Sequence, residues 1–172
     1  PRTLVVRRDG VDPLPAWDAF PCLVKPARSA SAARIDDRAA LEGAVGDALA
    51  TGDCVVQAVV EGGEERLLSY HAYVRADGSI AAELTGRKLR ARTGASTCVA
   101  VSHEPEVLFR GREIVEALGF TGVLTMDFKR DARDEQLYLL AIHPRFNLWH
   151  HAATVAGVAI PALVYEDCLH PV

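Results

Sequence analysis

The alternation of apolar and polar positions is most regular between residues 121 and 151. Two apolar runs, 122–128 and 136–142, stand on either side of a short charged gap. Such a pair of runs predicts a β-hairpin. Because side chains alternate between the two faces of a strand, the odd-numbered residues of 139–145 are expected on one face, and Asp127 of the partner strand can point to the same side.

Further apolar runs predict strands in the first half of the chain. Residues 20–25 form a short run that ends in lysine, and residues 54–60 are almost continuously apolar, as in a buried strand. Residues 67–75 and 79–85 flank an Asp-Gly pair, which is a strong signal for a tight hairpin turn. Residues 94–97, Gly-Ala-Ser-Thr, predict a loop.

Helical periodicity marks the remaining long segments. Residues 36–50 begin with two aspartates, either of which can cap a helix. Residues 104–118 place apolar side chains on one face and are followed by Gly119, a typical helix end. Residues 149–156 are expected to be helical, and Pro161 can open a last helix. The mixture of strands and helices predicts an α+β fold.

Composition and charge exclude several classes of protein. Hydrophobic residues make up 49% of the 172 residues and charged residues 24%, a balance that favours a folded globular chain over a disordered one. The net charge of −4 argues against general nucleic-acid binding. The most apolar window, 148–165, is interrupted by two histidines and a proline, which argues against a membrane span.

The four cysteines are widely scattered and form no Cys-x-x-Cys pair. This spacing favours buried, free thiols in a reducing compartment, so a cytoplasmic location is expected and a zinc site is not. The cysteines are Cys22, Cys54, Cys98 and Cys168.

The end of the central hairpin gathers three side chains that suit phosphate chemistry. Asp127, His143 and Arg145 would converge there if the second strand continues to Arg145. Arginine matches phosphate oxygens and aspartate binds hard cations, so the group suits a polyphosphate with its metal ion. A solvated hairpin end is the alternative interpretation of the same residues.

The order of residues adds a family resemblance. LLAIHPRFNLWHH at 139–151 resembles the metal-binding signature of the ATP-grasp superfamily, roughly hydrophobic-Glu-hydrophobic-Asn-Pro-Arg, and the carboxylate–amine ligase branch often continues with Phe-Asn-hydrophobic-Trp-His. TMDFKRD at 125–131 resembles the strand that supplies the first metal-binding carboxylate. The chain departs from the signature at Ala141, where the family has its bridging Glu, and at His143, where it has Asn.

The resemblance implies the ATP-grasp fold, in which two α/β subdomains with antiparallel sheets are joined by a hinge. The subdomains would be residues 1–60 and 61–172, and a further N-terminal domain or partner would complete the protein. The implied function is that of the ATP-binding domain of a ligase, which activates a small-molecule carboxylate as an acyl phosphate for attack by an amine and forms ADP. ATP and Mg2+, or Mn2+, would be the cofactors.

Basic residues are implied as phosphate ligands. Lys25 falls on the nucleotide-phosphate lysine of the family, and Arg28 and Ser29 fall in its phosphate loop. From local sequence alone, Lys25 would instead be a surface lysine before a flexible linker. Lys88, in a basic cluster, would lie near phosphates or an anionic substrate, with Arg90 as the alternative and a basic surface turn as the simpler interpretation.

The hinge is implied as the adenosine site. Backbone groups of Gln57, Ala58, Val59 and Val60 would hydrogen-bond adenine, and Glu64 would bind the ribose hydroxyls.

The central hairpin is implied as the catalytic and metal site. Asp127 would bind one metal ion, Arg145 would bind the transferring phosphoryl group or the substrate carboxylate, and His143 is a further candidate metal ligand. Because Ala141 has no oxygen to offer, a nucleotide-binding pseudoenzyme or regulatory domain is the alternative to an active ligase. An α+β interaction domain that binds no nucleotide is the third hypothesis.

Overall fold

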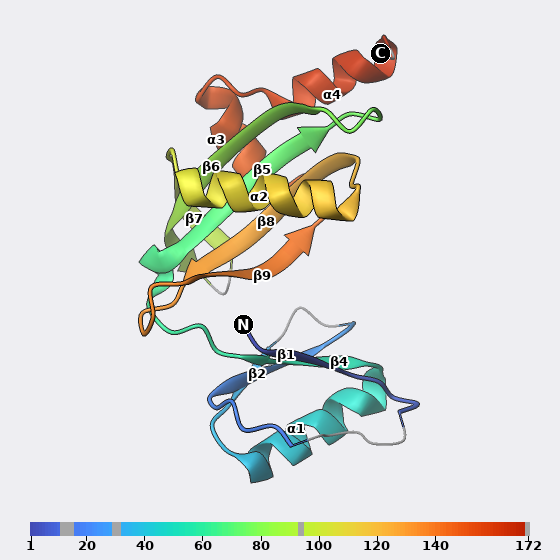
Figure 1. Ribbon diagram of the computed structural model, residues 1–172, viewed down its shortest axis with the longest axis vertical. Helices are drawn as coiled ribbons and strands as arrows, with labels where there is room; N and C mark the ends of the chain where they lie inside the picture. Colours follow the sequence, from blue (N-terminus) through green and yellow to red (C-terminus); the bar gives the residue numbers. More distant parts are fainter. Residues whose placement is uncertain (11–15, 29–31, 93–94, 171–172) are drawn as a thin grey trace. The chain divides into compact units, whose positions relative to one another are not determined.

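The computed structural model describes residues 1–10, 16–28, 32–92 and 95–170 (Figure 1). The chain divides into two compact units, an N-terminal unit, Pro1–Val60, and a C-terminal unit, Glu61–Val172. Each unit has an antiparallel sheet and its own hydrophobic core.

The N-terminal unit is a four-stranded antiparallel sheet in the order β1-β4-β2-β3, with α1 packed against it (Figure 1). Its elements are β1 (Thr3–Val6), β2 (Cys22–Pro26), β3 (Ala33–Ile35), α1 (Arg38–Thr51) and β4 (Cys54–Ala58).

The helix α1 begins and packs as its sequence predicts. The Asp37 carboxylate accepts a hydrogen bond from the backbone N–H of Ala40 at 2.9 Å, so it is the N-cap. Leu41, Val45 and Ala48 recur at helical spacing on one face and are buried in the core of this unit.

The C-terminal unit is a five-stranded antiparallel sheet in the order β7-β6-β5-β8-β9. Its elements are the short 3-10 helix η1 (Glu64–Arg66), β5 (Leu67–Val74), β6 (Ile80–Arg92), β7 (Ala95–Val101), α2 (Pro105–Leu118), β8 (Gly122–Arg130), β9 (Leu137–His143), α3 (Trp149–Val155) and α4 (Ile160–Leu169).

The two faces of this sheet are covered differently. The helix α2 lies across one face, over a core of alternate strand residues that includes Tyr70, Leu124 and Met126 (Figure 1). The helices α3 and α4 pack against the opposite face, where Ile160 meets Leu84 and Val123. They cover only the part of that face near this apolar cluster, and polar residues follow further along the same strands.

Both predicted hairpins and all four predicted helices are confirmed, but two predictions on strands are wrong. The segment predicted as a loop, 94–97, contributes Ala95 to Thr97 to β7, while residues 93 and 94 lie outside the described part of the chain. In β9, Phe128 pairs with Leu139 but Asp127 pairs with Ala141, so Leu140 is an extra residue in a β-bulge. Leu139 therefore packs on the α2 side, and only Ala141 and His143 face the side of Asp127.

The prediction that the cysteines are buried is correct for two of the four. Cys22 and Cys54 are buried in the N-terminal unit, whereas Cys98 and Cys168 are exposed, and all four are free thiols. Cys98 lies on β7 and Cys168 near the end of α4, where each element turns one side to solvent.

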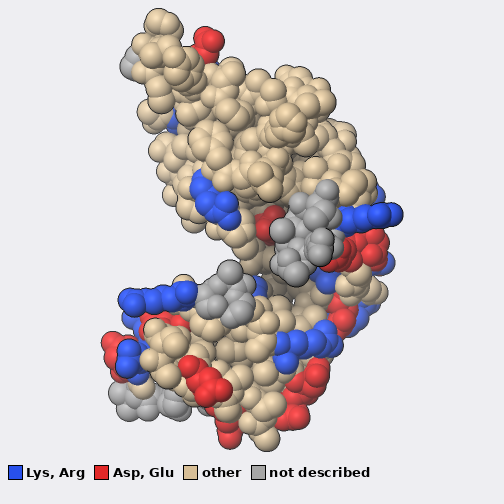
Figure 2. Space-filling view, turned by 180° about the vertical axis from the view of Figure 1, so that it is seen from behind, with Lys and Arg blue, Asp and Glu red and all other residues tan. Residues whose placement is uncertain are grey.

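Charged and apolar residues are unevenly spread over the surface. Figure 2 shows Lys and Arg intermixed with Asp and Glu on the N-terminal unit, whereas much of the visible surface of the C-terminal unit carries no charge. Exposed apolar side chains on and beside α3 and α4 include Leu148, Val155, Tyr165 and Leu169. Within the described residues no single helix is long and apolar enough to span a membrane, and α3 and α4 meet the criteria only as a pair, bent by 90° at their junction.

Candidate functional site

The open face of the C-terminal sheet carries the candidate catalytic residues. Ser69 on β5 pairs with Asp127 on β8 and with Gly86 on β6, so these three positions lie side by side. A Cβ atom at Gly86 would lie 2.6 Å from the Trp149 ring, so only glycine lets α3 approach β6 this closely. The face is thus polar at its centre and bordered by α3.

Asp127 and His143 meet across β8 and β9. The Nε2 atom of His143 lies 3.2 Å from Oδ2 of Asp127, and the Ser69 hydroxyl donates to the other carboxylate oxygen at 3.4 Å. The side chains of Asp127 and His143 are 44% and 36% exposed, so a ligand can reach both of them. The hairpin therefore brings together two of the three residues that the sequence places at its end.

Arg145 lies outside the strand. The strand β9 ends at His143, and the backbone N–H of Arg145 donates to the His143 carbonyl at 2.9 Å, which turns the chain. The exposed guanidinium donates to the Phe146 carbonyl at 3.2 Å. The expectation that Arg145 continues the strand face of Asp127 is therefore wrong, because the chain turns after His143.

The donor set suits one hard metal ion better than two. Mg2+ is commonly held by one or two carboxylates together with phosphate oxygens and water, and Asp127 can supply one carboxylate. Ala141 lies directly opposite Asp127 in the pairing, so the position that would supply a bridging carboxylate has only a methyl group. Among the described residues, no group of three or more His, Cys, Asp or Glu side chains could hold a metal ion.

A buried polar cluster supports the floor of this face and was missed from the sequence. The Thr125 hydroxyl lies 3.1 Å from Nδ1 of His71 and accepts a hydrogen bond from the Asn147 side-chain amide at 3.1 Å. The backbone N–H of Asn147 donates to Nδ1 of His150 at 3.0 Å. The rings of His71 and Trp149 are 5.2 Å apart. These contacts tie the segment after β9 to β5 and β8.

Both buried imidazoles of this cluster are neutral near pH 7. Burial lowers the pKa of His71 to about 3, and the neighbouring His150 adds to the effect. Burial also lowers the pKa of His150. Nδ1 of His71 lies beside the Thr125 hydroxyl and Nδ1 of His150 lies beside the backbone N–H and carbonyl of Asn147, whereas neither Nε2 atom has a hydrogen-bond partner among the described residues.

The N-terminal unit positions the predicted phosphate lysine against the predicted hinge strand. The Lys25 ammonium donates to Oε1 of Gln57 at 2.6 Å, and the Gln57 amide donates to the Thr3 hydroxyl at 3.2 Å. Burial lowers the pKa of Lys25. A partly buried ammonium whose partner is a neutral amide would gain from a phosphate oxygen as a ligand.

Hydrogen bonds within the N-terminal unit reduce the number of backbone N–H groups that could donate to adenine. The backbone N–H of Ala58 donates to the Arg2 carbonyl and that of Val59 donates to the Pro21 carbonyl, both at 2.9 Å. These two amides are already engaged, so donation to a base would fall to Val60.

The remaining predicted ligands are at the surface. Arg28 is exposed in the turn after β2, and Ser29 lies outside the described residues. Glu64 is exposed at the start of η1. Lys88 is half-buried on β6, two residues beyond Gly86, which puts it on the Asp127 side of the sheet, and a β-bulge separates it from Arg90.

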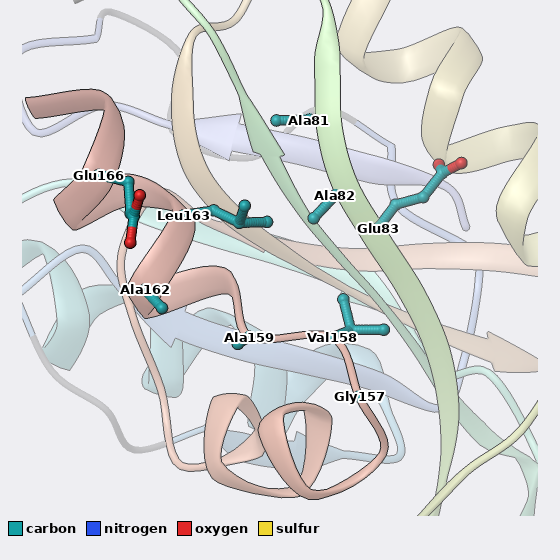
Figure 3. Close-up of a pocket in the computed structure, with 9 residues that line it drawn as sticks. All are labelled: Ala81, Ala82, Glu83, Gly157, Val158, Ala159, Ala162, Leu163 and Glu166. Atoms are coloured by element: carbon teal, nitrogen blue, oxygen red, sulfur yellow. The ribbon is translucent and has the colours of Figure 1, made fainter. Parts of the chain in front are cut away.

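A surface pocket of about 470 Å3 between β6 and α4 contains none of the predicted site residues (Figure 3). Figure 3 shows its two carboxylates, Glu83 and Glu166, on opposite sides. The Glu83 carboxylate accepts a hydrogen bond from the Tyr70 hydroxyl at 2.9 Å and forms an ion pair with Arg112. Because none of the candidate site residues lines it, the pocket is separate from the candidate site.

Comparison with known proteins finds similarity at the level of structure. No protein-family profile matches the chain. No curated protein sequence matches it either. The L-amino acid ligase of Bacillus licheniformis matches with a TM-score of 0.69 and 18% identity, over 100% of this chain and 44% of that enzyme.

Two further solved structures agree. The D-alanine–D-alanine ligase of Bacillus anthracis, complexed with ATP, has a TM-score of 0.67 and 16% identity, over 98% of this chain and 60% of that one. The N5-carboxyaminoimidazole synthetase of Staphylococcus aureus has a TM-score of 0.59 and 17% identity, over 78% of this chain and 36% of that one. The chain thus spans less than two thirds of the length of each of these enzymes.

These similarities establish the class of fold. The chain has the ATP-grasp fold, an α+β arrangement of two antiparallel sheets with helices, as its sequence predicts. Of the three enzymes named above, two are amino acid ligases by name and the third is a synthetase.

Proposed function

We propose that this chain is the ATP-binding part of an ADP-forming ligase that joins a small-molecule carboxylate to an amine through an acyl phosphate. One observation carries the proposal. Asp127 and His143 meet at 3.2 Å on the open face of a sheet whose fold matches a ligase solved with ATP. Acceptor binding would also involve parts of the protein beyond this chain.

Each candidate residue would have a distinct role in binding the nucleotide. Lys25 would exchange its hydrogen bond to Gln57 for a phosphate oxygen, and Lys88 would add positive charge from the face of the C-terminal sheet. Val60 and Glu64 would bind adenine and ribose. The two ammonium groups would offset phosphate charge.

The hairpin residues would act on the transferring phosphoryl group. Asp127 would hold one Mg2+ or Mn2+ together with phosphate oxygens, and His143 would be a softer second ligand. Such an ion offsets charge that develops on the phosphoryl group. Arg145, exposed beyond β9, would bind the phosphoryl group or the substrate carboxylate.

Thermal unfolding with ADP, in the absence and presence of Mg2+, tests the proposal. A ligand at 100 times its Kd stabilises the folded state by about 2.7 kcal/mol. For a chain of this size, that corresponds to a rise in Tm of roughly 5–10 °C. We expect ADP to raise the Tm and Mg2+ to increase the rise.

Variants test separately the Tm shift with ADP alone and the further shift that Mg2+ adds. We expect Asp127→Asn to abolish the Mg2+ increment while a shift with ADP alone remains, and Lys25→Met to reduce both. Asp47→Asn, an exposed change on α1, should leave both shifts intact. No shift at saturating ADP in the unaltered protein would refute the proposed function.

A nucleotide-binding pseudoenzyme is the second candidate, and Ala141 favours it. The methyl group of Ala141 lies opposite Asp127, where a bridging carboxylate would complete a two-metal site. A missing metal ligand costs several kcal/mol of transition-state stabilisation, or about two or more orders of magnitude in rate.

Ala141→Glu tests the missing-ligand account. The added carboxylate beside Asp127 should lower the Tm without metal, through like-charge repulsion, and should enlarge the Mg2+-dependent shift with ADP. It should also raise ATP turnover. Ala141→Gln, which has the same size without the charge, is the control. Equal Mg2+ responses of the Glu and Gln variants would contradict a simple missing ligand.

A further inference from the structure

The charged turn between β8 and β9, residues 131–136, is hydrogen-bonded to residues 61–66, the segment that opens the C-terminal unit. The backbone N–H of Glu61 donates to Oδ2 of Asp131 at 3.3 Å, and the backbone N–H of Ala132 donates to the Glu61 carbonyl at 3.1 Å. Both backbone polar groups of Glu61 are therefore held by two consecutive residues of the turn.

Asp131 is the centre of this attachment. Its carboxylate is only 1% exposed and accepts hydrogen bonds from the Arg133 guanidinium at 2.9 and 2.6 Å and from the Arg133 backbone N–H at 2.8 Å. The hydrogen bonds from the Arg133 side chain hold the pKa of Asp131 well below its usual range. A buried carboxylate is stable only when its oxygens are satisfied, so Asp131, Arg133 and Glu61 form one unit of structure.

A second contact fastens the other end of the segment. The Arg66 guanidinium donates to both carboxylate oxygens of Glu135, at 2.9 and 3.1 Å. Gly62 has a φ of 111°, and a Cβ atom there would lie 2.4 Å from Cδ of Arg66. Only glycine therefore allows the segment to fold back under Arg66.

The same hairpin thus supports two halves of a nucleotide site. Glu64, the candidate ribose ligand, lies between Glu61 and Arg66, which are both attached to the turn. Asp127, the candidate metal ligand, lies on β8, four residues before Asp131. We propose that Asp131 is a positioning residue for the adenosine half of the nucleotide, because it holds segment 61–66 against the hairpin that carries Asp127. This inference rests on the proposed function.

The experiment compares a ligand that has an adenosine half with one that lacks it. Titration calorimetry with Mg2+ would measure the binding of ADP and of pyrophosphate to the unaltered chain and to Asp131→Ala. We expect the variant to weaken ADP binding on the order of tenfold, the scale for losing one positioned hydrogen-bonding group. Pyrophosphate binding should change less than about twofold, since Asp127 and the lysines are untouched.

Two further variants separate positioning from general stability. Asp134→Ala is the matched control, because the Asp134 carboxylate accepts hydrogen bonds from the Gln136 N–H and the Tyr138 hydroxyl, both at 2.9 Å, inside the same hairpin. It should bind both ligands normally. Asp131→Asn keeps an oxygen for the Glu61 N–H and should restore part of the ADP affinity, and it replaces the Ala variant if that fails to fold.

The outcomes are distinct. Equal losses for ADP and pyrophosphate would show a merely structural role, and unchanged ADP binding in Asp131→Ala would overturn the positioning role alone. If the unaltered chain binds neither ligand, the proposed function fails and this role fails with it.

Discussion

At the scale of single residues, His71 is the most consequential buried group. Its ring is fully buried, its Nδ1 atom lies 3.1 Å from the Thr125 hydroxyl, and burial lowers its pKa to about 3 in the folded protein. The pKa of an unfolded histidine is about 6.5. Between these values the unfolded chain binds a proton that the folded chain does not, so stability falls as the pH falls through 6.5 toward 3.

The free energy of unfolding should therefore decrease by about 2 kcal/mol from His71 between pH 7 and pH 5. His150, whose pKa is also lowered, acts in the same direction. Urea denaturation at the two pH values measures the change. His71→Asn does not titrate in this range and should show a smaller pH dependence, even though it is less stable at pH 7. An equal pH dependence in the variant would contradict this account.

Residue-level prediction succeeded where the relevant contacts are local. The meeting of Asp127 with His143 follows from the period of two along a hairpin, which the sequence displays. His71 and Thr125 are 54 positions apart, so their hydrogen bond depends on strand pairing that no local pattern reveals. The one sequence signal for this contact was a histidine, His71, inside the apolar run 67–75. The roles proposed for the site residues stay predictions.

At the scale of elements, the packing of α2 on the sheet depends on one missing side chain. Gly111 lies in the middle of α2, and a Cβ atom there would be 2.5 Å from Cγ of Tyr70. The Tyr70 ring is fully buried, and its hydroxyl donates to Glu83. Neither the ring nor the helix can move without disturbing these contacts.

Gly111→Ala should therefore destabilise the chain by about 1–3 kcal/mol, the cost of overpacking a core, although alanine is the better helix former. Gly46→Ala on α1 is the matched control, since nothing lies within 4 Å of its Cβ position. That change should stabilise the chain by about 0.5–1 kcal/mol. Chemical denaturation of both variants measures the pair of effects, and a Gly111→Ala variant as stable as the unaltered chain would contradict the packing argument.

Elements with strong end signals were predicted well. Asp37 caps α1, and Gly119, in the left-handed conformation, ends α2. The errors fall where backbone pairing overrides composition. Ala95 to Thr97 are small residues typical of a loop, but β6 extends to Arg92 and pairs with Ala95 and Ser96.

At the scale of the whole molecule, the fold is retained although sequence identity to proteins that share it is low. The chain matches solved ligases at 16% to 18% identity with TM-scores above 0.6. The pattern of buried positions explains this, because a core needs apolar residues at given places rather than given residues. Each unit has its own buried cluster, built from Val24, Leu41 and Val56 in the N-terminal unit and from Tyr70, Leu124 and Phe128 in the C-terminal unit.

The β-bulge in β9 has a consequence for aligning this chain with distant relatives. Counted from Leu137 and Leu139, which face α2, strict alternation would assign Leu140 to the side of Asp127, yet the residue there is Ala141. A relative whose strand lacks the bulge would be one residue shorter between the turn and the metal-ligand position. An alignment that places the compensating gap after Ala141, rather than at Leu140, would therefore compare Leu140 with the residue at the proposed metal-ligand position of such a relative.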